Sequence, residues 1–470
     1  MSILTTLTTR WPFFLASAFL FLSAQVAAQA EVPKDTHEYL LKNGLRLIVK
    51  EDHRAPTVAH MVWYKAGSID EVNGKTGVAH VLEHMMFKET KHLKPGEFSK
   101  KVGEVGGRDN AFTSKDYTAY FQQVEKSHLP KMMALEADRM VNLKISENEF
   151  VKEIQVVMEE RRLRTDDNSQ AVVYEQLMAT AFTNSPYRNP IIGWMDDLKN
   201  MTYQDALDWY KTWYAPNNAV MVIVGDVNPK EVLALAEKYY GDIPPKSLPQ
   251  RKSQIEIPQI GAKKIFVKVP AENADIHMAW KVPKLEAGQL ENVEPYALSV
   301  LSAILDGHAN SRLNRKLVRD QRIANSVDAS YDMAARGPQL FMISATPTKS
   351  SSLDGLEKNI RTILSEIKNK GVTESELNRV KSQLLSSQIY KRDSVFAQAM
   401  EIGMSEMEGI SWKYLNDVLA NVQKVTSKDI QAVVAKYFVD DYLTIAILDP
   451  QAVDVNKSTA KPSASSGMRH

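Results

Sequence analysis

Two stretches of the chain decide its expected fold, "MTYQDALDWYKTWYAPNNAVMVIVGD" at 201–226 and "VTSKDIQAVVAKYFVDDYLTIAILDP" at 425–450. Each runs from a Thr that can cap a helix, through a helical pattern, into an apolar strand. Four positions match, Thr202 with Thr426, Asp205 with Asp429, Trp213 with Tyr437 and Tyr214 with Phe438. Any helix before a buried strand looks broadly similar, but the matched aromatic pair favours a duplication. We therefore expect an α+β protein of two homologous domains of about 200 residues each, with helices packed on mixed or antiparallel sheets.

Composition marks the boundaries of these domains. The segment 244–264, "PPKSLPQRKSQIEIPQIGAKK", is rich in Pro, Lys and Gln and has no sustained period, which is typical of a linker. It separates an expected N-terminal domain at 36–243 from an expected C-terminal domain at 265–450. The small, polar residues 451–470 predict a disordered tail.

Local patterns in the N-terminal domain predict several elements. Asn43-Gly44 indicates a β-hairpin, and residues 57–67 form a strand pattern that ends at a glycine. Residues 129–164 are helical in pattern and heavily charged. The apolar, β-branched run at 218–227 predicts a buried strand.

The overall composition indicates large hydrophobic cores and no bulk attraction to polyanions. Of the 470 residues, 44% are hydrophobic and 24% are charged, and the formal net charge is +1. Neither nucleic acid nor an anionic membrane surface is therefore an expected partner.

The N-terminus has the pattern of a secretory signal peptide at residues 1–30. Arg10 is its only charged side chain, an apolar run follows at 11–23, and Ala28-Gln29-Ala30 suits cleavage. An uncleaved membrane anchor is the alternative, but the run is short for a span, so we expect no stable span after cleavage. The chain has no cysteine. An exported protein without disulfides fits a bacterial periplasm better than a mitochondrion, whose transit peptides are rich in Arg.

The stretch "HVLEHMMF" at 80–87 carries the candidate chemistry. On a helix, His80 and His84 lie one turn apart on the same face, and their imidazole nitrogens suit zinc. Zinc lowers the pKa of a water molecule toward neutrality, and a neighbouring carboxylate such as Glu83 could take that proton. The alternative is an ordinary half-buried helix whose histidines are satisfied by their neighbours.

A catalytic zinc site usually has three protein ligands and one open position. The best source of the third ligand is the acidic stretch "EIQVVMEERRLR" at 153–164. Glu153 and Glu160 are two helical turns apart and share a face, whereas Glu159 points elsewhere. One of the two carboxylates could bind zinc while the other holds a ligating histidine by its second ring nitrogen.

Four stretches resemble the pitrilysin-like (M16) zinc peptidases, the insulinase and mitochondrial processing peptidase type, with the H-x-x-E-H order of inverzincins. They are "AGSIDEVNGKTGVAHVLEHMMFKET" (66–90), "GGRDNAFTSKDYTAYF" (106–121), "EIQVVMEERRLR" and "NNAVMVIVGDVNP" (217–229). The resemblance extends from about residue 36 to residue 450, and the first half carries the specific motifs. It implies that His80, His84 and Glu160 bind Zn²⁺, that Glu83 is the general base, and that Glu153 supports a ligating histidine.

The resemblance also implies how a peptide binds. "NAFTS" at 110–114 is similar to the family's active-site edge strand, to which a peptide substrate adds as a further strand. Asn110 and Ala111 would then contact the peptide backbone, and Phe112 would line a side-chain pocket. An ordinary edge strand is the alternative.

One departure from the family pattern points to a partner subunit. Active members pair an Arg with a downstream Tyr that grip the substrate. In "LVRDQRIANSV" (317–327), Arg319 is present, but Asn325 occupies the Tyr position and the segment is one residue short. The family also closes a chamber from four such domains, and this chain has two, half of a clamshell. We expect a homologous subunit without zinc that supplies the Arg-Tyr pair.

These observations favour a periplasmic zinc endopeptidase that hydrolyses peptides or unfolded segments as the zinc-bearing subunit of a heterodimer. The alternative is a chamber subunit of low activity or a peptide-binding scaffold. A zinc-storing or structural protein is disfavoured, because structural zinc sites have four protein ligands, often thiolates, and the chain has no cysteine.

Overall fold

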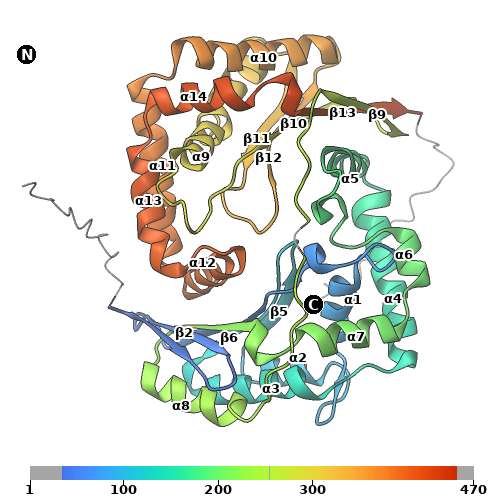
Figure 1. Ribbon diagram of the computed structural model, residues 1–470, viewed down its shortest axis with the longest axis vertical. Coiled ribbons are helices and arrows are strands. Elements are labelled where there is room, and N and C mark those ends of the chain that lie inside the picture. The colour runs from blue at the N-terminus through green and yellow to red at the C-terminus, as the bar shows by residue number, and fades with distance from the viewer. Residues whose placement is uncertain (1–33, 253, 453–470) are drawn as a thin grey trace, which may run out of the picture. The chain divides into compact units, whose positions relative to one another are not determined.

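The computed structural model describes residues 34–252 and 254–452, whose largest elements are two β-sheets with their helices (Figure 1). The first sheet belongs to the first half, residues 34–243. Its six strands, in spatial order, are β1 (Thr36–Leu40), β2 (Arg46–Glu51), β8 (Ala219–Gly225), β3 (Thr57–Tyr64), β6 (Thr118–Glu125) and β5 (Arg108–Thr113). The second sheet belongs to the second half, residues 263–452. Its five strands are β11 (Ala324–Tyr331), β12 (Gln339–Pro347), β10 (Asp275–Val282), β13 (Leu443–Gln451) and β9 (Lys263–Pro270).

The two sheets have the same topology apart from the added strand β1. In the first, β2 pairs with β8 in parallel, and β8, β3, β6 and β5 continue antiparallel. In the second, β9 pairs with β13 in parallel, and β13, β10, β12 and β11 continue antiparallel. The prediction of two homologous α+β domains with mixed sheets is therefore confirmed.

The duplicated stretches begin at equivalent helix caps. Helix α7 (Tyr203–Trp213) starts with a capping box, in which the Thr202 side chain accepts from the Asp205 N–H and the Asp205 carboxylate accepts from the Thr202 N–H. Helix α14 (Ser427–Tyr437) starts with the same box between Thr426 and Asp429. Such a box satisfies two backbone donors that a helix start leaves free. Each helix leads into the strand that pairs in parallel.

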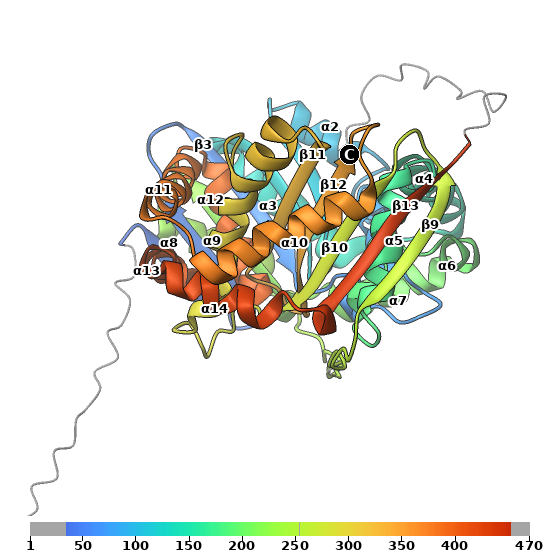
Figure 2. The same cartoon turned by 90° about the horizontal axis from the view of Figure 1, so that it is seen from above.

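Most of the remaining helices pack on the sheet of their own half. In the first half they are α1 (Val78–Met85), α2 (Glu97–Gly103), α3 (Leu129–Asn142), α4 (Glu147–Arg161), α5 (Ser169–Ala181), α6 (Met195–Asn200) and α8 (Pro229–Tyr240). In the second they are α9 (Val293–Asp306), α10 (Leu353–Lys370), α11 (Glu374–Lys391), α12 (Val395–Glu408) and α13 (Leu415–Lys424). Helices α9, α10 and α14 share one hydrophobic core with the second sheet, and α10 and α14 lie across that sheet in Figure 2.

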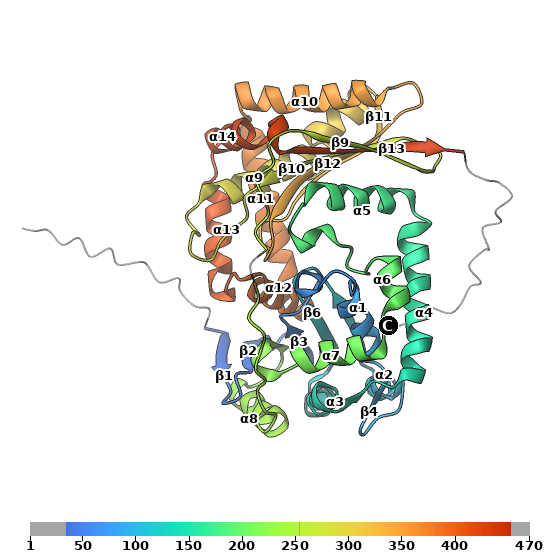
Figure 3. The same cartoon turned by 45° about the vertical axis from the view of Figure 1, so that its right-hand side comes forward.

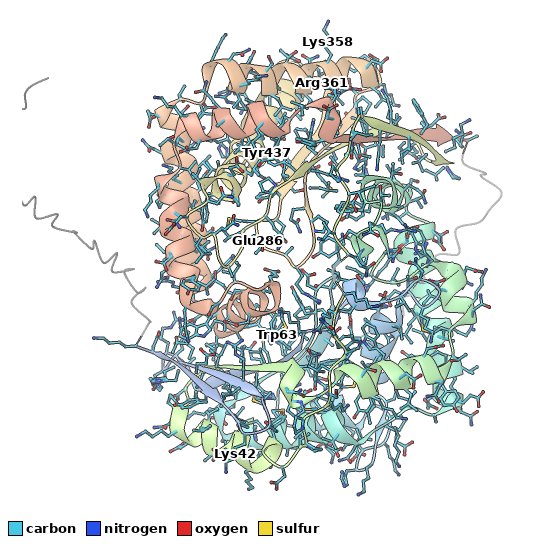
Figure 4. All side chains as sticks on the ribbon, viewed as in Figure 1. Lys42, Trp63, Glu286, Lys358, Arg361 and Tyr437 are labelled. Carbon is cyan, nitrogen blue, oxygen red and sulfur yellow. The ribbon has the colours of Figure 1, made fainter. Side chains whose placement is uncertain are left out.

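Two helices are exchanged between the halves. Helix α12 packs on the face of the first sheet that the first half leaves uncovered, the face on which Trp63 lies (Figure 4). Trp63 contacts Gly403 of α12. Helix α5 packs on β13 and β9 of the second sheet (Figure 3). All seven residues of β8 are buried for this reason, since alternate side chains enter opposite cores.

Local predictions agree with the structure except in one segment. The hairpin at Asn43-Gly44 and the strands within 57–67 and 218–227 are present. The segment 129–164 is broken, because α3 ends at Asn142 and α4 begins after Ser146, whose hydroxyl accepts from the Glu149 N–H. This S-x-x-E pattern of a helix start was present in the sequence.

The ends of the chain fall largely outside the described residues. The expected signal peptide at 1–30 lies outside them, as do residues 453–470 of the expected tail. Strand β13 extends to Gln451. The segment 244–262 has no helix or strand where it is described, and β9 begins at Lys263. Among the described residues, no helix is both long and apolar enough to cross a membrane.

Candidate metal centre

Helix α1 carries the H-x-x-E-H motif and begins at a buried cap. Gly77 precedes it with φ +88°, a left-handed conformation that glycine adopts without strain. The Glu71 carboxylate accepts the N–H of Gly77 and the N–H of Ala79, both at 2.9 Å. Burial raises the pKa of Glu71 to about 8, although the two N–H groups favour its charged form. Glu71 therefore fixes the end of the helix from which the histidines project.

His80, His84 and Glu160 form a cluster that suits a metal ion. One donor atom from each lies within 4.8 Å of the others. His84 Nε2 is 3.2 Å from Glu160 Oε2, and His80 Nε2 is 3.9 Å from Glu160 Oε1. Two ligand atoms at about 2.1 Å from one tetrahedral zinc ion lie about 3.4 Å apart, so the residues fit zinc. Three protein ligands match an open, catalytic type of site rather than a closed structural one.

Glu153 contacts the second ring nitrogen of His84. His84 Nδ1 is 2.9 Å from Glu153 Oε1, and Lys88 Nζ is 2.5 Å from Glu153 Oε2. Burial opposes ionisation of Glu153, but these bonds outweigh it and hold its pKa below the usual value. A carboxylate behind a ligating histidine fixes the ring orientation and the tautomer. Glu153 and Glu160, seven residues apart on α4, thus face His84 from its two sides.

The carboxylates also set the charge of the cluster in the absence of metal. Burial disfavours the His84 cation, yet its bonds to Glu153 and Glu160 raise its pKa to about 9. Burial likewise opposes charge on Glu160, but His84, His80 and Arg164 lower its pKa to about 2. Arg164 Nη1 lies 2.5 Å from Glu160 Oε1. Zinc would therefore replace a proton on His84, as in other sites where metal and proton compete.

Glu83 faces the same region and is joined to the edge of the first sheet. The Thr113 hydroxyl donates to Glu83 Oε2 at 2.5 Å. Burial raises the pKa of Glu83, and the Thr113 bond and His84 oppose that rise. Because Thr113 is the last residue of β5, the edge strand ends at this carboxylate.

Strand β5 is an edge strand that borders a cavity. Within the described part of the chain it pairs only with β6, so one side of its backbone has no strand partner there. A cavity of about 480 Å³ is lined by the cluster, by Glu83 and by Asn110, Ala111 and Phe112. The Ala111 N–H is bonded to the Asn110 side chain at 2.9 Å, and Phe112 packs edge-on against Trp63. The three residues expected to contact a peptide therefore lie together beside the metal cluster.

Comparison with known proteins agrees with this geometry. Residues 46–194 match the family model "Insulinase (Peptidase family M16)", and residues 200–384 match "Peptidase M16 inactive domain". "Zinc protease PqqE" of Helicobacter pylori is 33% identical over 442 residues, which cover 91% of this chain and 96% of that protein. The chain belongs to the M16 peptidase family. It is a zinc protease of that family, and its His-His-Glu cluster lies within the first family match.

Solved structures of M16 and related proteases share the fold. The crystal structure of a protease from Helicobacter pylori superposes with a TM-score of 0.84 at 31% identity and covers 89% of this chain and 100% of that one. The periplasmic protease PqqL of Escherichia coli superposes with a TM-score of 0.77 at 18% identity and covers 91% of this chain and 50% of that one. The M16 chain therefore corresponds in fold to about half of PqqL.

Arg319 is not brought to the metal cluster of this M16 chain. It lies on a π-helical turn, Asn314–Asp320, in the second half, is exposed, and bonds to the Asn310 side chain. The next strand carries Asn325 at a register shift, where its side-chain amide donates to the Pro347 carbonyl at 3.0 Å. Neither residue lines the cavity of the cluster.

Several residues that shape the M16 site were not predicted from the sequence. Lys88, Thr113 and Glu71 contact the candidate site residues or cap their helix. Lys88 lies beyond the end of α1 at Met85 and bonds to Glu153 on α4. No local spacing indicates Lys88, Glu71 or Thr113, because their contacts depend on tertiary folding.

Proposed function

We propose that this M16 protease is an endopeptidase that cleaves peptides or unfolded segments bound along β5. The observation that carries the proposal is the Thr113–Glu83 hydrogen bond of 2.5 Å, which joins the edge strand to the carboxylate beside the metal cluster. A peptide added to β5 would have its backbone held by main-chain hydrogen bonds. One of its carbonyl groups would then lie between Glu83 and the cluster.

Each residue has a role consistent with its contacts. His80, His84 and Glu160 would hold zinc, which supplies the polarisation that makes water nucleophilic near neutral pH. Glu83 would take the proton of the attacking water and pass it to the leaving amine. Thr113 holds one Glu83 oxygen and so orients the carboxylate. Glu153 would keep His84 in the tautomer that binds metal.

The test compares Glu83→Gln with the wild-type chain. The variant should retain one zinc per chain by elemental analysis and lose about 10²- to 10⁴-fold in kcat/KM on an unstructured peptide. Thr113→Val should lower kcat while zinc content is unchanged, because it removes only the orienting bond. Wild-type activity in Glu83→Gln would refute the assignment of the base.

We also propose that a homologous subunit without zinc completes the active site. Support comes from Asn325, whose short side chain is bonded to Pro347, and from Arg319, which does not line the cavity. The fold also matches only about half of PqqL. The native complex should contain a second M16 chain, and adding it should raise peptide cleavage. Equal rates with and without that chain would refute this proposal.

A scaffold of low activity is the second candidate function, favoured by Asn325 in place of Tyr. It predicts that the complete complex binds peptides and that Glu83→Gln leaves the low rate of peptide cleavage unchanged. The same Glu83→Gln assay therefore separates the two candidates.

We propose the periplasm as the location of the protein. The signal-peptide pattern at 1–30 supports this, and PqqL, which shares the fold, is described as periplasmic. Fractionation should find a mature chain that begins near Gln29 or Glu31 in the periplasmic fraction, and an uncleaved chain in the membrane fraction would contradict it.

A further inference from the structure

The cavity beside the metal cluster is lined by charged groups whose partners differ. Besides the two histidines and two tyrosines, six carboxylate or basic side chains line it, three acidic, Glu83, Glu160 and Glu175, and three basic, Lys115, Arg164 and Arg188. A buried or half-buried charge is stable only when it is paired or hydrogen-bonded. The protein partner of each charged group therefore shows which of these groups are available to bind a ligand of opposite charge.

Four of the six belong to the metal site or its framework. Glu160 is paired with Arg164 at 2.5 Å and with the histidines. Glu175 is paired with Arg161 at 2.8 Å. Glu83 accepts from Thr113 and is the proposed base. None of these is available to recognise a substrate side chain.

Lys115 and Arg188 are the remaining two, and both are cations. Within residues 34–252 and 254–452, neither forms an ion pair with a carboxylate. Lys115 Nζ lies 4.7 Å from the centre of the Tyr187 ring, and Arg188 donates to the Thr183 carbonyl at 3.2 Å. Burial lowers the pKa of Lys115 to about 8, and the neighbouring charge of Asp116 only partly opposes that shift.

The one carboxylate next to Lys115 in sequence is already engaged. Asp116 accepts from the Tyr187 hydroxyl at 2.5 Å and from the Arg336 backbone N–H at 2.9 Å. The first bond also fixes Tyr187, a buried residue that lines the cavity, contacts Lys115 through its ring and directly precedes Arg188. Asp116 attracts Lys115 electrostatically, but its carboxylate oxygens already accept these two hydrogen bonds and make no ion pair with the Lys115 ammonium group.

Lys115 lies close to the proposed point of cleavage, and Arg188 lines the same cavity. Thr113, at the end of β5, is bonded to Glu83, and Lys115 follows two residues later. Two residues span at most about 7 Å of extended chain. A peptide bound along β5 would therefore present a side chain near Lys115 within a few residues of the scissile bond.

We propose that Lys115 and Arg188 form a subsite for a carboxylate of the peptide substrate. The proposal rests on the proposed peptidase function and names its substrate class, peptides with an acidic group near the cleaved bond. The carboxylate can come from an Asp or Glu side chain or from the C-terminus, and both would make charge-assisted hydrogen bonds to these donors.

A neighbouring cavity with acidic residues in its wall could instead bind a basic side chain of the peptide. It shares Lys115 and Tyr187 with the first cavity, but its wall also includes Asp332 and Glu408. Burial, together with Asp332 and Asp116, raises the pKa of Glu408 to about 8. A substrate side chain directed into that cavity would have to be basic or neutral, so peptide preference separates the two possibilities.

The experiment measures peptide preference with the complete native complex. One set of amidated peptides carries Asp or Glu, or else Asn or Gln, at each of the positions flanking the cleaved bond. A second set has no acidic side chain and ends, near that bond, in a free carboxylate or an amide. At one position we expect kcat/KM to favour the acid over its amide by about 10- to 100-fold. The set that shows the preference identifies the source of the carboxylate.

Variants assign the preference to the two cations. Lys115→Met and Arg188→Met should each lower the acid-to-amide ratio, the double variant should bring it near one, and Lys115→Glu should reverse it toward Lys-containing peptides. Arg162→Met is the matched control, because Arg162 is an exposed cation outside the cavity that pairs with Glu159. It should leave the ratio at the wild-type value.

A binding measurement separates failure of the subsite from failure of the peptidase. Fluorescence anisotropy of labelled peptides with zinc-loaded Glu83→Gln reports binding without turnover. Equal binding of acid and amide peptides, or a preference that survives in the double variant, would overturn the subsite and leave the peptidase standing. Absence of binding by every peptide would overturn both.

Discussion

Arg161 and Glu175 form a two-pronged buried ion pair, with Nη1 2.8 Å from Oε2 and Nη2 3.0 Å from Oε1. Arg161 Nη1 also donates to the Gly193 carbonyl at 2.8 Å. Because Arg161 directly follows Glu160, the pair ties the end of α4 to α5 and to the loop that abuts the start of α1. It thus connects the elements that carry the three metal-cluster residues.

Removing this cation should damage both stability and the metal site. Arg161→Met leaves Glu175 as a buried charge without its partner, and breaking such a pair costs about 3–5 kcal/mol. Chemical denaturation of the zinc-free chain measures the loss, and titration with a zinc indicator should show weaker binding. Arg162→Met is the neighbouring control, since its pair with Glu159 is exposed and should contribute at most about 1 kcal/mol. Similar losses in both variants would contradict the connecting role of Arg161.

Substitutions at two glycines before α1 distinguish backbone strain from steric clash as the source of lost stability. Gly74 and Gly77 both have φ +88°, but a Cβ on Gly74 would meet nothing within 4 Å. A Cβ on Gly77 would lie 2.4 Å from the Ile192 carbonyl oxygen. Gly74→Ala should therefore cost about 1–2 kcal/mol of unfolding free energy for the left-handed backbone alone. Gly77→Ala should lower the unfolding free energy clearly more than Gly74→Ala does and should also weaken zinc binding. Equal losses of stability in the two variants would mean that the loop around Ile192 shifts to accept the new Cβ without moving α1.

Adjacent glutamates test the third metal ligand. Glu160 lies 3.2 Å from His84, whereas Glu159 is exposed and pairs with Arg162. Glu160→Gln should weaken zinc binding by more than the roughly 10–100-fold that loss of an outer partner costs. Glu159→Gln should leave zinc content and affinity unchanged. Competition with a chelator measures the zinc affinity of each variant. If Glu159→Gln weakened zinc binding and Glu160→Gln did not, the third ligand would be Glu159.

Glu256 should make the connection between the halves sensitive to acid. Its carboxylate accepts N–H groups from residues 183–185 at 2.9 Å and pairs with Lys281 at 2.8 Å. Burial opposes ionisation, but the Lys281 and backbone bonds lower the pKa of Glu256 to about 2. A depressed pKa stabilises the folded state fully above the unfolded pKa of 4.5, and this stability is lost as pH falls toward 2.

The corresponding variant is Glu256→Gln. At pH 7 it should be less stable than wild type by about 1–3 kcal/mol, and the gap should close between pH 5 and pH 2. Urea denaturation across that range measures it. Glu272→Gln, at an exposed carboxylate, should show no gap, and a gap for Glu256→Gln that does not depend on pH would refute the charge-based explanation.

Local spacing accounts for the parts of the site that could be predicted. His80 and His84 share a helix face because they are one turn apart, and Glu153 and Glu160 share one because they are two turns apart. That α4 packs against α1 is a long-range fact, and only the family resemblance selected Glu160 over Glu153 as the ligand. The Thr113–Glu83 bond depends on the register of β5, which the pattern of that strand does not specify.

The exchange of α5 and α12 was equally beyond local reasoning. An amphipathic helix shows that it has a buried face but not which sheet will cover that face. The break before Ser146, by contrast, had a local signal in Ser146 and Glu149, and the continuous charged pattern of 129–164 obscured it.

The exchanged helices have a consequence for synthesis of the chain. The first sheet emerges from the ribosome with one apolar face bare, and its cover, α12, is made only near the end of the chain. The first sheet therefore cannot complete its second core until the last helices have been made, and we expect such contacts between distant parts of the sequence to slow folding. We expect neither half to be soluble when expressed alone, because each sheet would then lack the helix that covers one of its apolar faces.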